Sequence, residues 1–423
     1  MVTKKTADKG KPPKDNAAST DGFKTDLYVP ANANEAIVPV RTEMLIAGIG
    51  GAGGNSLVRL IKNNLTQDPE YYSKIPYVKM MFINTDGDAL DAIENDQDIM
   101  KVLGGNDNII RISTKESGGA GGNPQKGKEL MEKALQETNL LKGKIGGENI
   151  VFAIYGSGKG TGTGAGPVFM EHVIAENPSV LPVVISTMPF GFEGKRRFKY
   201  AVEGYENLKN AGDNSIRILR ILNEQLRKNF EAETGSTLSL EKAFSVADKA
   251  MGDALNTIID IRQYTGEVNV DIQDIRSVLG EPGQTLLCYN LLVTGNEKAQ
   301  QVIDRIYKTQ IHGDAKQLIN TAKGMLIAFY TPEGNKTSML DDMERIVTNL
   351  SGQNEDMNVI FGSAQKVTLK KDELEIGLIL TGIDDSNIAE AAYSANPVDR
   401  SDYKIQHTGA DFLTNQLKNQ PDK

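Results

Sequence analysis

The chain contains 423 residues, of which 39% are hydrophobic and 24% charged, and its formal net charge is −9. This length allows two or three domains with a full hydrophobic core, and the acidic balance argues against a general nucleic-acid or membrane-surface coat. The single cysteine, Cys288, excludes a disulfide framework and a cysteine-based zinc cluster, and the three histidines (His172, His312, His407) are too far apart in sequence to indicate a metal site. No apolar run approaches the roughly 18 residues of a membrane span, and the polar, Lys-rich N-terminus does not resemble a secretory signal. We therefore expect a cytoplasmic protein.

The first half of the chain alternates between apolar runs and helical patterns. Residues 1–39 show no periodicity and predict a disordered tail. Short, nearly continuous apolar runs predict buried strands at residues 44–47, 77–84, 149–155 and 181–187. Helical patterns lie between them at residues 55–64, 124–141 and 168–176. This alternation predicts a mostly parallel α/β sheet covered on both faces.

The second half has a different character. Apolar residues at helical spacing predict a long helix over about residues 240–262. Four further runs predict strands at residues 286–294, 323–330, 359–363 and 375–381, in a smaller α/β or α+β domain. From about residue 384 the chain is again polar and irregular.

The first of three glycine-rich segments, Gly48 to Asn55, follows a predicted strand and opens a helix. Such a turn presents backbone N–H groups and a helix N-terminus to a phosphate, although a tight strand–helix turn has the same pattern. A nicotinamide-binding fold would place an acidic residue about 20 positions beyond the glycines. Here the second strand ends later, in Asn84-Thr85-Asp86, so the oxidoreductase interpretation is weakened.

The second segment, Gly118 to Pro124, directly precedes a helix with proline in its first turn. Residues 122–128 nearly match a Walker A spacing, but Glu129 stands where a Ser or Thr would bind Mg²⁺. We reject a P-loop on this ground.

The third segment, Gly156 to Gly164, alternates Gly with Thr between a strand and a helix. Consecutive amides and two hydroxyls suit a di- or triphosphate, and so many glycines are costly in a purely structural loop. Loops at the carboxyl ends of parallel strands meet in one crevice. The three segments together predict a nucleotide-phosphate site.

At this point the sequence resembles the FtsZ/tubulin superfamily, and its bacterial FtsZ branch in particular. Residues 158–164 resemble the tubulin signature G-G-G-T-G-T-G, and Asn84-Thr85-Asp86 with Ala89-Leu90 resembles the N-T-D-x-x-A-L loop. Residues 189–197 (PFGFEGKRR) resemble the ribose-contacting loop, and residues 269–276 (NVDIQDIR) resemble the synergy loop N-V-D-F-A-D-V-R. The resemblance covers roughly residues 42–383, with the motifs in order.

The resemblance implies a tubulin/FtsZ-like fold, in which a parallel-sheet GTP-binding domain is joined by a long central helix to a smaller α+β domain. The implied divisions are a disordered tail at 1–39, the GTP-binding domain at 40–239, the central helix at 240–268, the α+β domain with the synergy loop at its start at 269–383, and a flexible tail at 384–423. The implied nucleotide contacts are Gly50, Gly51, Ala52, Asn55, Asn84, Asp86, Ala120, Gly121, Gly122, Asn123, Gly158, Lys159, Gly160, Thr161, Gly162, Thr163, Gly164, Glu193, Arg197, Asn223, Phe244 and Asp248.

Physical chemistry agrees with the implied base contacts. Asp248 lies one helical turn beyond Phe244, so both side chains project from one helix face. The ring can stack on a purine while the carboxylate accepts two N–H donors, which guanine presents and adenine does not. Alone, Phe244 would more often be a core residue; with Asp248 and the other motifs it favours guanine. Glu193 and Arg197 would hold the ribose and neighbouring groups.

In the resembled family the synergy loop reaches the nucleotide of the next subunit in a filament. Asn269, Asp271 and Asp274 would then be the catalytic residues, with the carboxylates orienting a water for in-line attack on the γ-phosphate. A charged, solvated loop is the alternative interpretation of Asp271 and Asp274. The expected cofactors are GTP or GDP with Mg²⁺ bound to the nucleotide, no metal site of the protein itself is expected, and the expected partner is a second copy, head to tail.

Two departures bear on the cellular role. Lys159 replaces the second glycine of the signature, and either adds a cation near the phosphates or blocks the close backbone approach. The Asp411-Phe412-Leu413 segment is a faint match to the family's peptide for membrane tethers or adaptors. Cell division by a cytokinetic ring is the leading interpretation. The alternatives are a plasmid or phage filament that positions DNA, and a nucleotide-binding polymer without turnover.

Overall fold

A computed structural model describes residues 42–113, 118–137, 141, 143–264, 268–281, 283, 285–308, 319–334, 340–352, 354 and 356–383. The tails expected at 1–39 and 384–423, with the segment at residues 411–413, lie outside the described residues.

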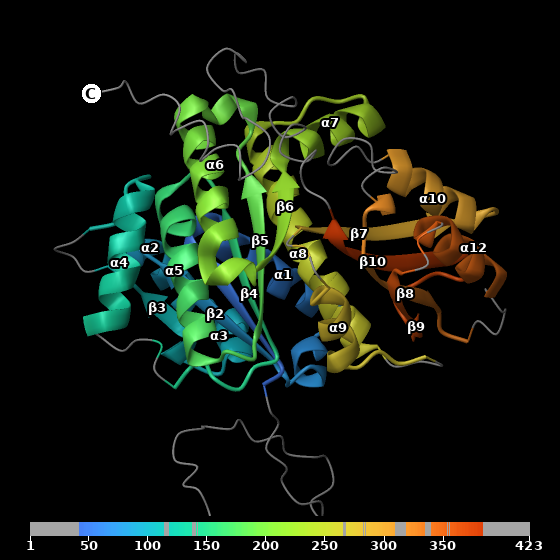
Figure 1. The fold of residues 1–423 in the computed structure, drawn as a ribbon, viewed down its shortest axis with the longest axis horizontal. Helices are drawn as coiled ribbons and strands as arrows, with labels where there is room; N and C mark the ends of the chain where they lie inside the picture. The colour runs from blue at the N-terminus through green and yellow to red at the C-terminus, as the bar shows by residue number, and fades with distance from the viewer. Residues whose placement is uncertain are drawn as a thin grey trace, which may run out of the picture.

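Within the described residues the strands form one ten-stranded sheet in the order β3-β2-β1-β4-β5-β6-β7-β10-β8-β9 (Figure 1). The strands are β1 (Met44–Ile49), β2 (Val78–Asn84), β3 (Ile109–Arg111), β4 (Ile150–Gly156), β5 (Leu181–Met188), β6 (Arg217–Leu222), β7 (Thr285–Thr294), β8 (Gly324–Pro332), β9 (Asn358–Lys366) and β10 (Glu373–Ile383). The pairs from β3 to β7 are parallel, β10 runs antiparallel to β7 and β8, and β8 and β9 are parallel.

The helices fill the connections between these strands. The α-helices are α1 (Gly50–Gln67), α2 (Gly87–Glu94), α3 (Gln97–Leu103), α4 (Pro124–Glu137), α5 (Gly160–Glu176), α6 (Lys195–Asn210), α7 (Asn223–Thr234), α8 (Leu240–Gln263), α9 (Ile272–Leu279), α10 (Lys298–Lys308) and α12 (Leu340–Ser351). Single 3₁₀ turns are η1 (Tyr71–Lys74), η2 (Asn106–Asn108), η3 (Gly191–Glu193) and η4 (Ala211–Asn214). Among the described helices, none combines the length and the apolar character needed to cross a bilayer.

The parallel half of the sheet is buried on both faces, which explains why its strands are almost continuously apolar. On one face, Leu57 and Ile61 of α1 pack in a single core with Met251 and Leu255 of α8. On the other face, α4, α5 and α6 contribute a second core that includes Phe169 of α5 (Figure 1). Loops that project from the strand ends are therefore held by rigid layers on both sides.

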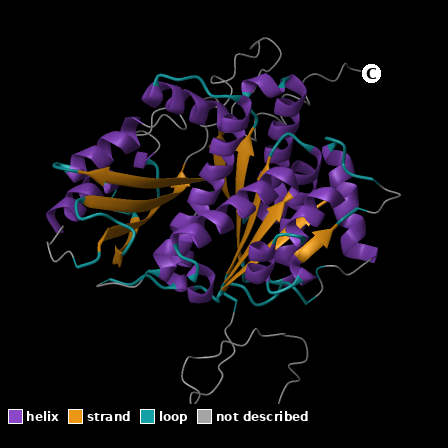
Figure 2. Ribbon diagram, turned by 180° about the vertical axis from the view of Figure 1, so that it is seen from behind, coloured by secondary structure: helices purple, strands orange, loops and turns teal. Residues whose placement is uncertain are grey.

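The second half of the sheet carries its own helical cover. Val302 and Ile306 of α10 and Ile346 and Leu350 of α12 pack on β7, β8 and β10. Figure 2 shows from behind how these strands splay away from the parallel ones. The two halves meet where β6 pairs with β7, and among the described residues this pairing joins Ile218 with Thr285 and Leu219 with Leu286.

The predicted fold class is confirmed, and the differences lie in the details. β3 was not predicted because three residues give no periodic pattern, and β6 was not predicted because Arg217 and Arg220 interrupt its apolar run. Helices α1 and α5 begin at Gly50 and Gly160, earlier than the expected starts at residues 55 and 168. The glycine-rich segments are therefore partly helical themselves. Helix α4 is described as far as Glu137, and the next three residues of its expected range lie outside the described residues.

Candidate nucleotide-binding site

The three glycine-rich segments meet at one cavity, as the sequence predicted. The cavity has a volume of about 780 Å³ and lies at the carboxyl ends of β1, β2 and β4. Twelve of the expected nucleotide contacts line it: Gly51, Ala52, Asn84, Asp86, Ala120, Gly121, Gly122, Lys159, Gly160, Thr161, Gly162 and Arg197.

Two helices point their N-termini at this cavity without a side-chain cap. The N-cap residues are Ile49 for α1 and Lys159 for α5, and neither side chain accepts a hydrogen bond from the first turn. The first N–H groups of both helices thus retain their capacity to bind an anion, reinforced by the positive end of each helix dipole. This arrangement fits phosphate oxygens.

The glycines around the cavity have two different reasons to be glycine. A Cβ built on Gly51, Gly121 or Gly122 would meet no atom within 4 Å, so these backbones face open space that a ligand can approach. A Cβ on Gly53 would lie 2.0 Å from the Ile154 oxygen, and one on Gly164 would lie 2.0 Å from the Pro124 oxygen. Close packing, and not contact with a ligand, therefore explains why positions such as Gly53 and Gly164 are glycine.

Thr85 connects the second and third segments, although it was absent from the expected contacts. Its Oγ1 is 2.8 Å from Oγ1 of Thr161 in α5 and accepts a 3.2 Å hydrogen bond from the N–H of Ala120 in the second segment. Its carbonyl oxygen accepts a hydrogen bond from the hydroxyl of Ser113 at 2.6 Å. The sequence signal for Thr85 was its place in the Asn84-Thr85-Asp86 motif, in which only Asn84 and Asp86 were expected to contact the nucleotide.

Several expected contacts use their side chains to shape the loops. The Asn84 Oδ1 accepts hydrogen bonds from the N–H groups of Thr85 and Asp86. Asp86 caps α2 by accepting from the Ala89 N–H. The Thr163 Oγ1 accepts a 2.8 Å hydrogen bond from the Gly158 N–H. These side chains hold the backbone in place around the cavity.

The structure does not bring all expected contacts to this cavity. Asn123, Thr163 and Gly164 line a separate cavity of about 530 Å³ together with residues of α5 and α6. The Asn123 side chain accepts from the Gln125 N–H at the start of α4. Gly50, whose backbone has φ +69°, and Gly158 do not line the main cavity either.

Phe244, the residue expected to stack on the base, belongs to an aromatic cluster. Phe244 lies edge-on to Phe190 and Phe192, with ring centroids 5.6 and 6.1 Å apart, and Phe192 is 55% exposed. Lys159 lies over the Phe244 ring with its Nζ 5.5 Å from the centroid. Phe244 is half-buried, so its ring is partly available to a ligand.

Polar groups near the ring suit a purine edge. Asp248 is half-buried and its Oδ1 is 3.4 Å from the Ser56 hydroxyl. Burial raises the pKa of the Asp248 carboxyl to about 6, against the opposing effect of Arg59 and Lys159. Asn223, at the start of α7, is buried with an amide oxygen that has no partner among the described residues, and buried polar groups normally have one. Asn55 is exposed on α1.

Glu193 and Arg197, expected at the ribose, form an ion pair in which Arg197 Nη1 donates to Glu193 Oε2 at 2.5 Å. Glu193 Oε1 also accepts from the Phe190 N–H. Glu193 therefore holds both Arg197, which lines the cavity, and the loop that carries the aromatic cluster.

The expected catalytic residues lie near the amino ends of the parallel strands, at the opposite end of the strands from the cavity. Asp271 is the N-cap of α9, and its Oδ1 accepts from the N–H groups of Gln273 and Asp274. Asp274 in turn accepts from the Asp271 N–H through its Oδ2, which completes a capping box. Asn269 and Asp271 are exposed.

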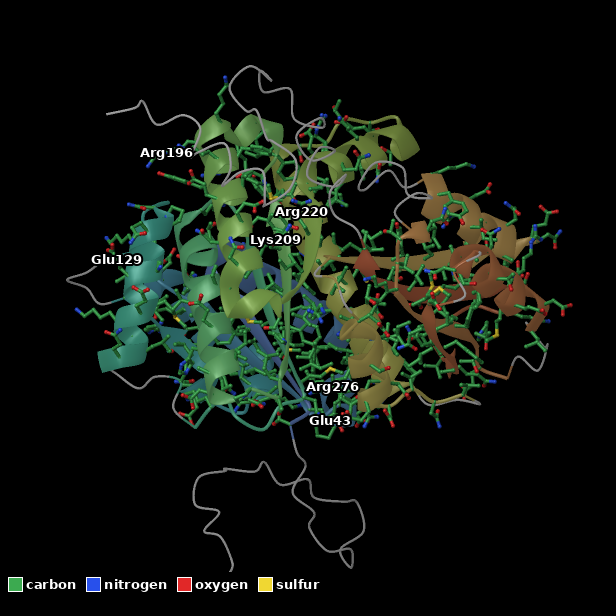
Figure 3. All side chains as sticks on the ribbon, in the orientation of Figure 1. Glu43, Glu129, Arg196, Lys209, Arg220 and Arg276 are labelled. Atoms are coloured by element: carbon green, nitrogen blue, oxygen red, sulfur yellow. The ribbon has the colours of Figure 1, made fainter. Side chains whose placement is uncertain are left out.

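Arg276 fixes the position of α9. Its guanidinium donates to the carbonyl oxygens of Asn149, just before β4, and Ser179, just before β5, both at 2.7 Å. Figure 3 shows Arg276 beside Glu43 at the lower end of the molecule, and Arg196, in the first turn of α6, at the upper end. Strand β4 is seven residues long, so the amino and carboxyl ends of the parallel strands lie about 20 Å apart.

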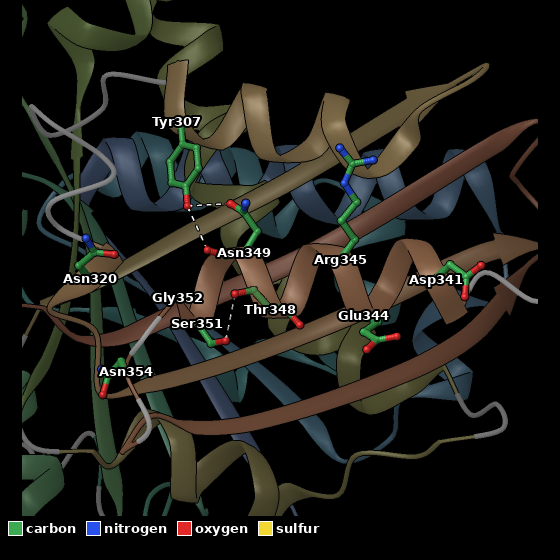
Figure 4. A pocket seen from close by; sticks show the side chains of 10 residues that line it. All are labelled: Tyr307, Asn320, Asp341, Glu344, Arg345, Thr348, Asn349, Ser351, Gly352 and Asn354. Carbon is green, nitrogen blue, oxygen red and sulfur yellow. Dashed lines mark hydrogen bonds between the residues drawn. The ribbon is translucent and has the colours of Figure 1, made fainter.

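A larger cavity, of about 1220 Å³, lies between α10 and α12 (Figure 4). Its wall carries the carboxylates of Asp341 and Glu344 and the guanidinium of Arg345, which donates to Gln300, and the Tyr307 hydroxyl donates to Asn349. Among the residues described in its wall, this cavity lacks the cluster of glycine amides that lines the first one.

The fold has a tubulin-like architecture, and the glycine-lined cavity is its candidate nucleotide site. Residues 43–230 match the family model described as Tubulin/FtsZ family, GTPase domain. The chain is 28% identical over 348 residues to the cell division protein FtsZ of Pseudomonas putida, covering 82% of this chain and 78% of that protein. It is also 28% identical over 366 residues to FtsZ of Wigglesworthia glossinidia brevipalpis, covering 85% of each chain. The resemblance to the FtsZ/tubulin superfamily, and to FtsZ in particular, is confirmed.

Solved structures agree with this assignment. An empty FtsZ dimer of M. jannaschii superposes with a TM-score of 0.62 at 28% identity, covering 81% of this chain and 88% of that one. A protofilament of CetZ2 from Haloferax volcanii, at 17% identity, shares the fold with a TM-score of 0.63 and covers 85% of this chain and 100% of that one.

Proposed function

We propose that the protein binds and hydrolyses GTP and assembles head to tail into filaments, with each active site completed by the next subunit. The uncapped N-termini of α1 and α5 and the open glycine backbones would hold the phosphates. Phe244 would stack on the guanine, whose N–H donors suit Asp248, and Asn223 and Asn55 would make further base contacts. Arg197, oriented by Glu193, would contact the ribose and neighbouring groups.

The observation that carries the split site is the position of α9. The hydrogen bonds from Arg276 to Asn149 and Ser179 hold α9 at the amino ends of β4 and β5. The cavity lies at the carboxyl end of β4, about 20 Å away. Asp271 and Asp274 therefore cannot reach a nucleotide bound to their own chain, but a copy stacked head to tail would bring them to it. Such a heterologous contact repeats without closing and generates a filament.

The capping box leaves the carboxylates equipped for catalysis. Asp271 uses Oδ1 and Asp274 uses Oδ2 within the box, so the other oxygen of each takes no part in it. These two oxygens, with Asn269 beside them, would orient and polarise the attacking water, because phosphoryl transfer depends mostly on positioning and electrostatics.

We propose that the nucleotide would bind together with Mg²⁺, which would supply positive charge beside the phosphates. The carboxylates of Asp86 and Asp88 line the cavity and supply oxygen, the kind of donor that Mg²⁺ prefers. Asp86 also caps α2, because its Oδ1 accepts the hydrogen bond from the Ala89 N–H.

The names of the FtsZ relatives support a role in cell division, and we propose a cytokinetic filament in the cytoplasm. Tethers or adaptors would bind the C-terminal tail. If GTP bound without turnover, the alternative of a non-hydrolysing polymer would replace this proposal.

The test is phosphate release from purified protein with GTP and Mg²⁺ as a function of protein concentration. We expect specific activity to rise from near zero above a threshold concentration, because hydrolysis needs a second subunit. Constant specific activity down to low concentration would show a self-contained site and contradict the split-site proposal.

A mixing experiment tests the same proposal more directly. Asp271→Asn removes the carboxylate but keeps a good N-cap residue, and Gly51→Val places a branched side chain in the open space of the cavity. Each variant alone should be inactive, the first with normal GTP affinity and the second without binding. A mixture should recover activity, since Gly51→Val subunits supply intact loops to nucleotides on Asp271→Asn subunits. No recovery from two well-folded variants would argue against sharing.

A further inference from the structure

Lys159 links the two halves of the proposed site. It directly precedes Gly160, the first residue of α5, so its backbone lies beside the N–H groups that face the cavity. Its ammonium group lies over the Phe244 ring, 5.5 Å from the ring centroid. The backbone is extended, with φ −108° and ψ 177°, so this position does not require glycine.

The other described cations of the cavity wall, Arg111 and Arg197, have carboxylate partners. Arg197 pairs with Glu193, and Arg111 pairs with Asp91 and Glu94. Within the described part of the chain Lys159 forms no such ion pair, and its direct contact is with the face of Phe244. Among the cavity-wall residues that the structure describes, its charge is thus the one that a ligand can engage without breaking a salt bridge.

A stacked purine and this ammonium cannot occupy the ring face together. Stacked rings approach to about 3.5–4.0 Å. With its Nζ 5.5 Å from the centroid, the ammonium would stand within about 2 Å of the plane of a base stacked on that face. The lysine must therefore leave the ring when a base arrives.

We propose that Lys159 exchanges its contacts on nucleotide binding: its ammonium covers Phe244 in the empty site and moves to the phosphate oxygens when the purine takes its place. This inference rests on the proposed function. Lys159 then opposes binding of the base and favours binding of the phosphates, so the site discriminates against guanine compounds that lack phosphate.

The two effects have opposite signs and can be separated with two ligands. Guanosine displaces the ammonium and offers no phosphate in return, whereas GDP offers both groups. A cation–π contact at an exposed site corresponds to about a two- to fivefold change in affinity, and a charge-assisted hydrogen bond to about tenfold or more.

The experiment measures guanosine and GDP affinities by displacement of a fluorescent GDP analogue, for the full chain and for Lys159→Ala and Lys159→Met. We expect both variants to bind guanosine about two- to fivefold more tightly and GDP about tenfold more weakly, with a shallower salt dependence for GDP. Lys249→Ala, which removes an exposed lysine next to Asp248 in sequence, is the charge-matched control and should shift neither affinity.

A shift of both ligands in the same direction, or no shift, would overturn the inference and leave the proposed function intact. Both weakening would mean that Lys159 contacts only the bound nucleotide; both strengthening would mean that it is an obstacle. Failure of the unmodified chain to bind GDP at all would instead contradict the proposed function. Thermal unfolding of each variant verifies that it is folded.

Discussion

The Arg276 guanidinium donates a 2.7 Å hydrogen bond to the main-chain oxygen of Asn149, the residue immediately before β4. The contact joins residues 127 positions apart and ties the start of the second half of the chain to the amino edge of the parallel sheet. The position of Asp271 relative to the nucleotide loops of the same chain is therefore fixed by main-chain anchors rather than by a flexible connection.

Arg276→Ala should lower GTP turnover at least about tenfold and leave GDP affinity unchanged, because it releases α9 but lies at the edge away from the cavity. The measurement is phosphate release beside equilibrium binding. Arg276→Lys cannot donate two parallel N–H groups and should recover only part of the turnover. Loss of nucleotide binding in Arg276→Ala would show that the amino ends of the strands and the cavity at their carboxyl ends are coupled within one chain.

Guanine affinity should depend on the ionisation of Asp248, whose pKa burial raises to about 6. In the proposed site the ionised carboxylate would accept the guanine N–H donors, so GDP affinity should fall about tenfold from pH 7 to pH 5. Asp248→Asn should flatten this pH profile and reduce the preference for GTP over ATP. A profile that keeps its shape in Asp248→Asn would assign the titration to another group.

In the protein without nucleotide, ionisation of the Asp248 carboxyl should lower the free energy of unfolding, whereas the same ionisation should raise the affinity for GDP. Because its pKa is higher in the folded protein than in the unfolded one, the unfolded state releases the proton more readily. As the pH rises from about 4 to about 6, the free energy of unfolding should therefore decrease, and this decrease should be smaller in Asp248→Asn. Chemical denaturation at several pH values measures this directly.

Gly53 and Gly51 should respond differently to the same substitution. A Cβ on Gly53 would lie 2.0 Å from the Ile154 oxygen, whereas one on Gly51 has no neighbour within 4 Å. We expect Gly53→Ala to lower the free energy of unfolding by about 2–3 kcal/mol or more, and Gly51→Ala to change it by less than about 0.5 kcal/mol. Urea denaturation compares the two, and equal effects would contradict the packing argument.

Lys366 should be essential for the junction between the two halves. Its buried ammonium donates to Asp260 of α8 at 2.7 Å and to Glu375 of β10 at 2.9 Å, and lies 3.9 Å from the Tyr330 ring centroid. Burial disfavours the ammonium, but the two carboxylates raise the pKa of Lys366 above its ordinary value. Lys366→Met leaves both carboxylates without their cation and should cost about 3–5 kcal/mol of stability.

The pH dependence of that loss provides its control. Burial raises the pKa of Asp260 even beside Lys366, and without the cation the folded protein should favour the protonated form more strongly. The stability deficit of Lys366→Met should therefore be smaller at pH 5 than at pH 8. A deficit that is the same at both pH values would point to lost packing alone.

Much of the fold was predictable because its signals are local. Apolar runs defined most strands, glycine-rich segments marked the strand ends, and the topology of parallel sheets predicted that Gly51, Ala120 and Thr161 would meet. The contacts that tie these pieces together are not local. Thr85 and Thr161 are 76 residues apart, and Lys366 and Asp260 are 106 apart, so neither pair leaves a pattern in sequence.

The candidate site was predictable in outline and not in the use of its side chains. Asn84 and Asp86 lie where the motif placed them, but their oxygens accept hydrogen bonds from the loop backbone. The glycines could not be sorted into ligand-facing and packed positions, because that depends on what surrounds each missing Cβ. The contact between Lys159 and Phe244 likewise depends on how α5 and α8 are placed in space.

The narrow pairing of β6 with β7 has a mechanical consequence. The two strands are joined at Ile218–Thr285 and Leu219–Leu286, whereas β7 and β10 pair along most of their length. A pulling or bending load across the molecule would therefore meet its weakest ladder at this seam. Helix α8 and the buried cluster around Lys366 would carry that load, so the stiffness of a filament of such subunits would be set by side-chain packing rather than by strand pairing.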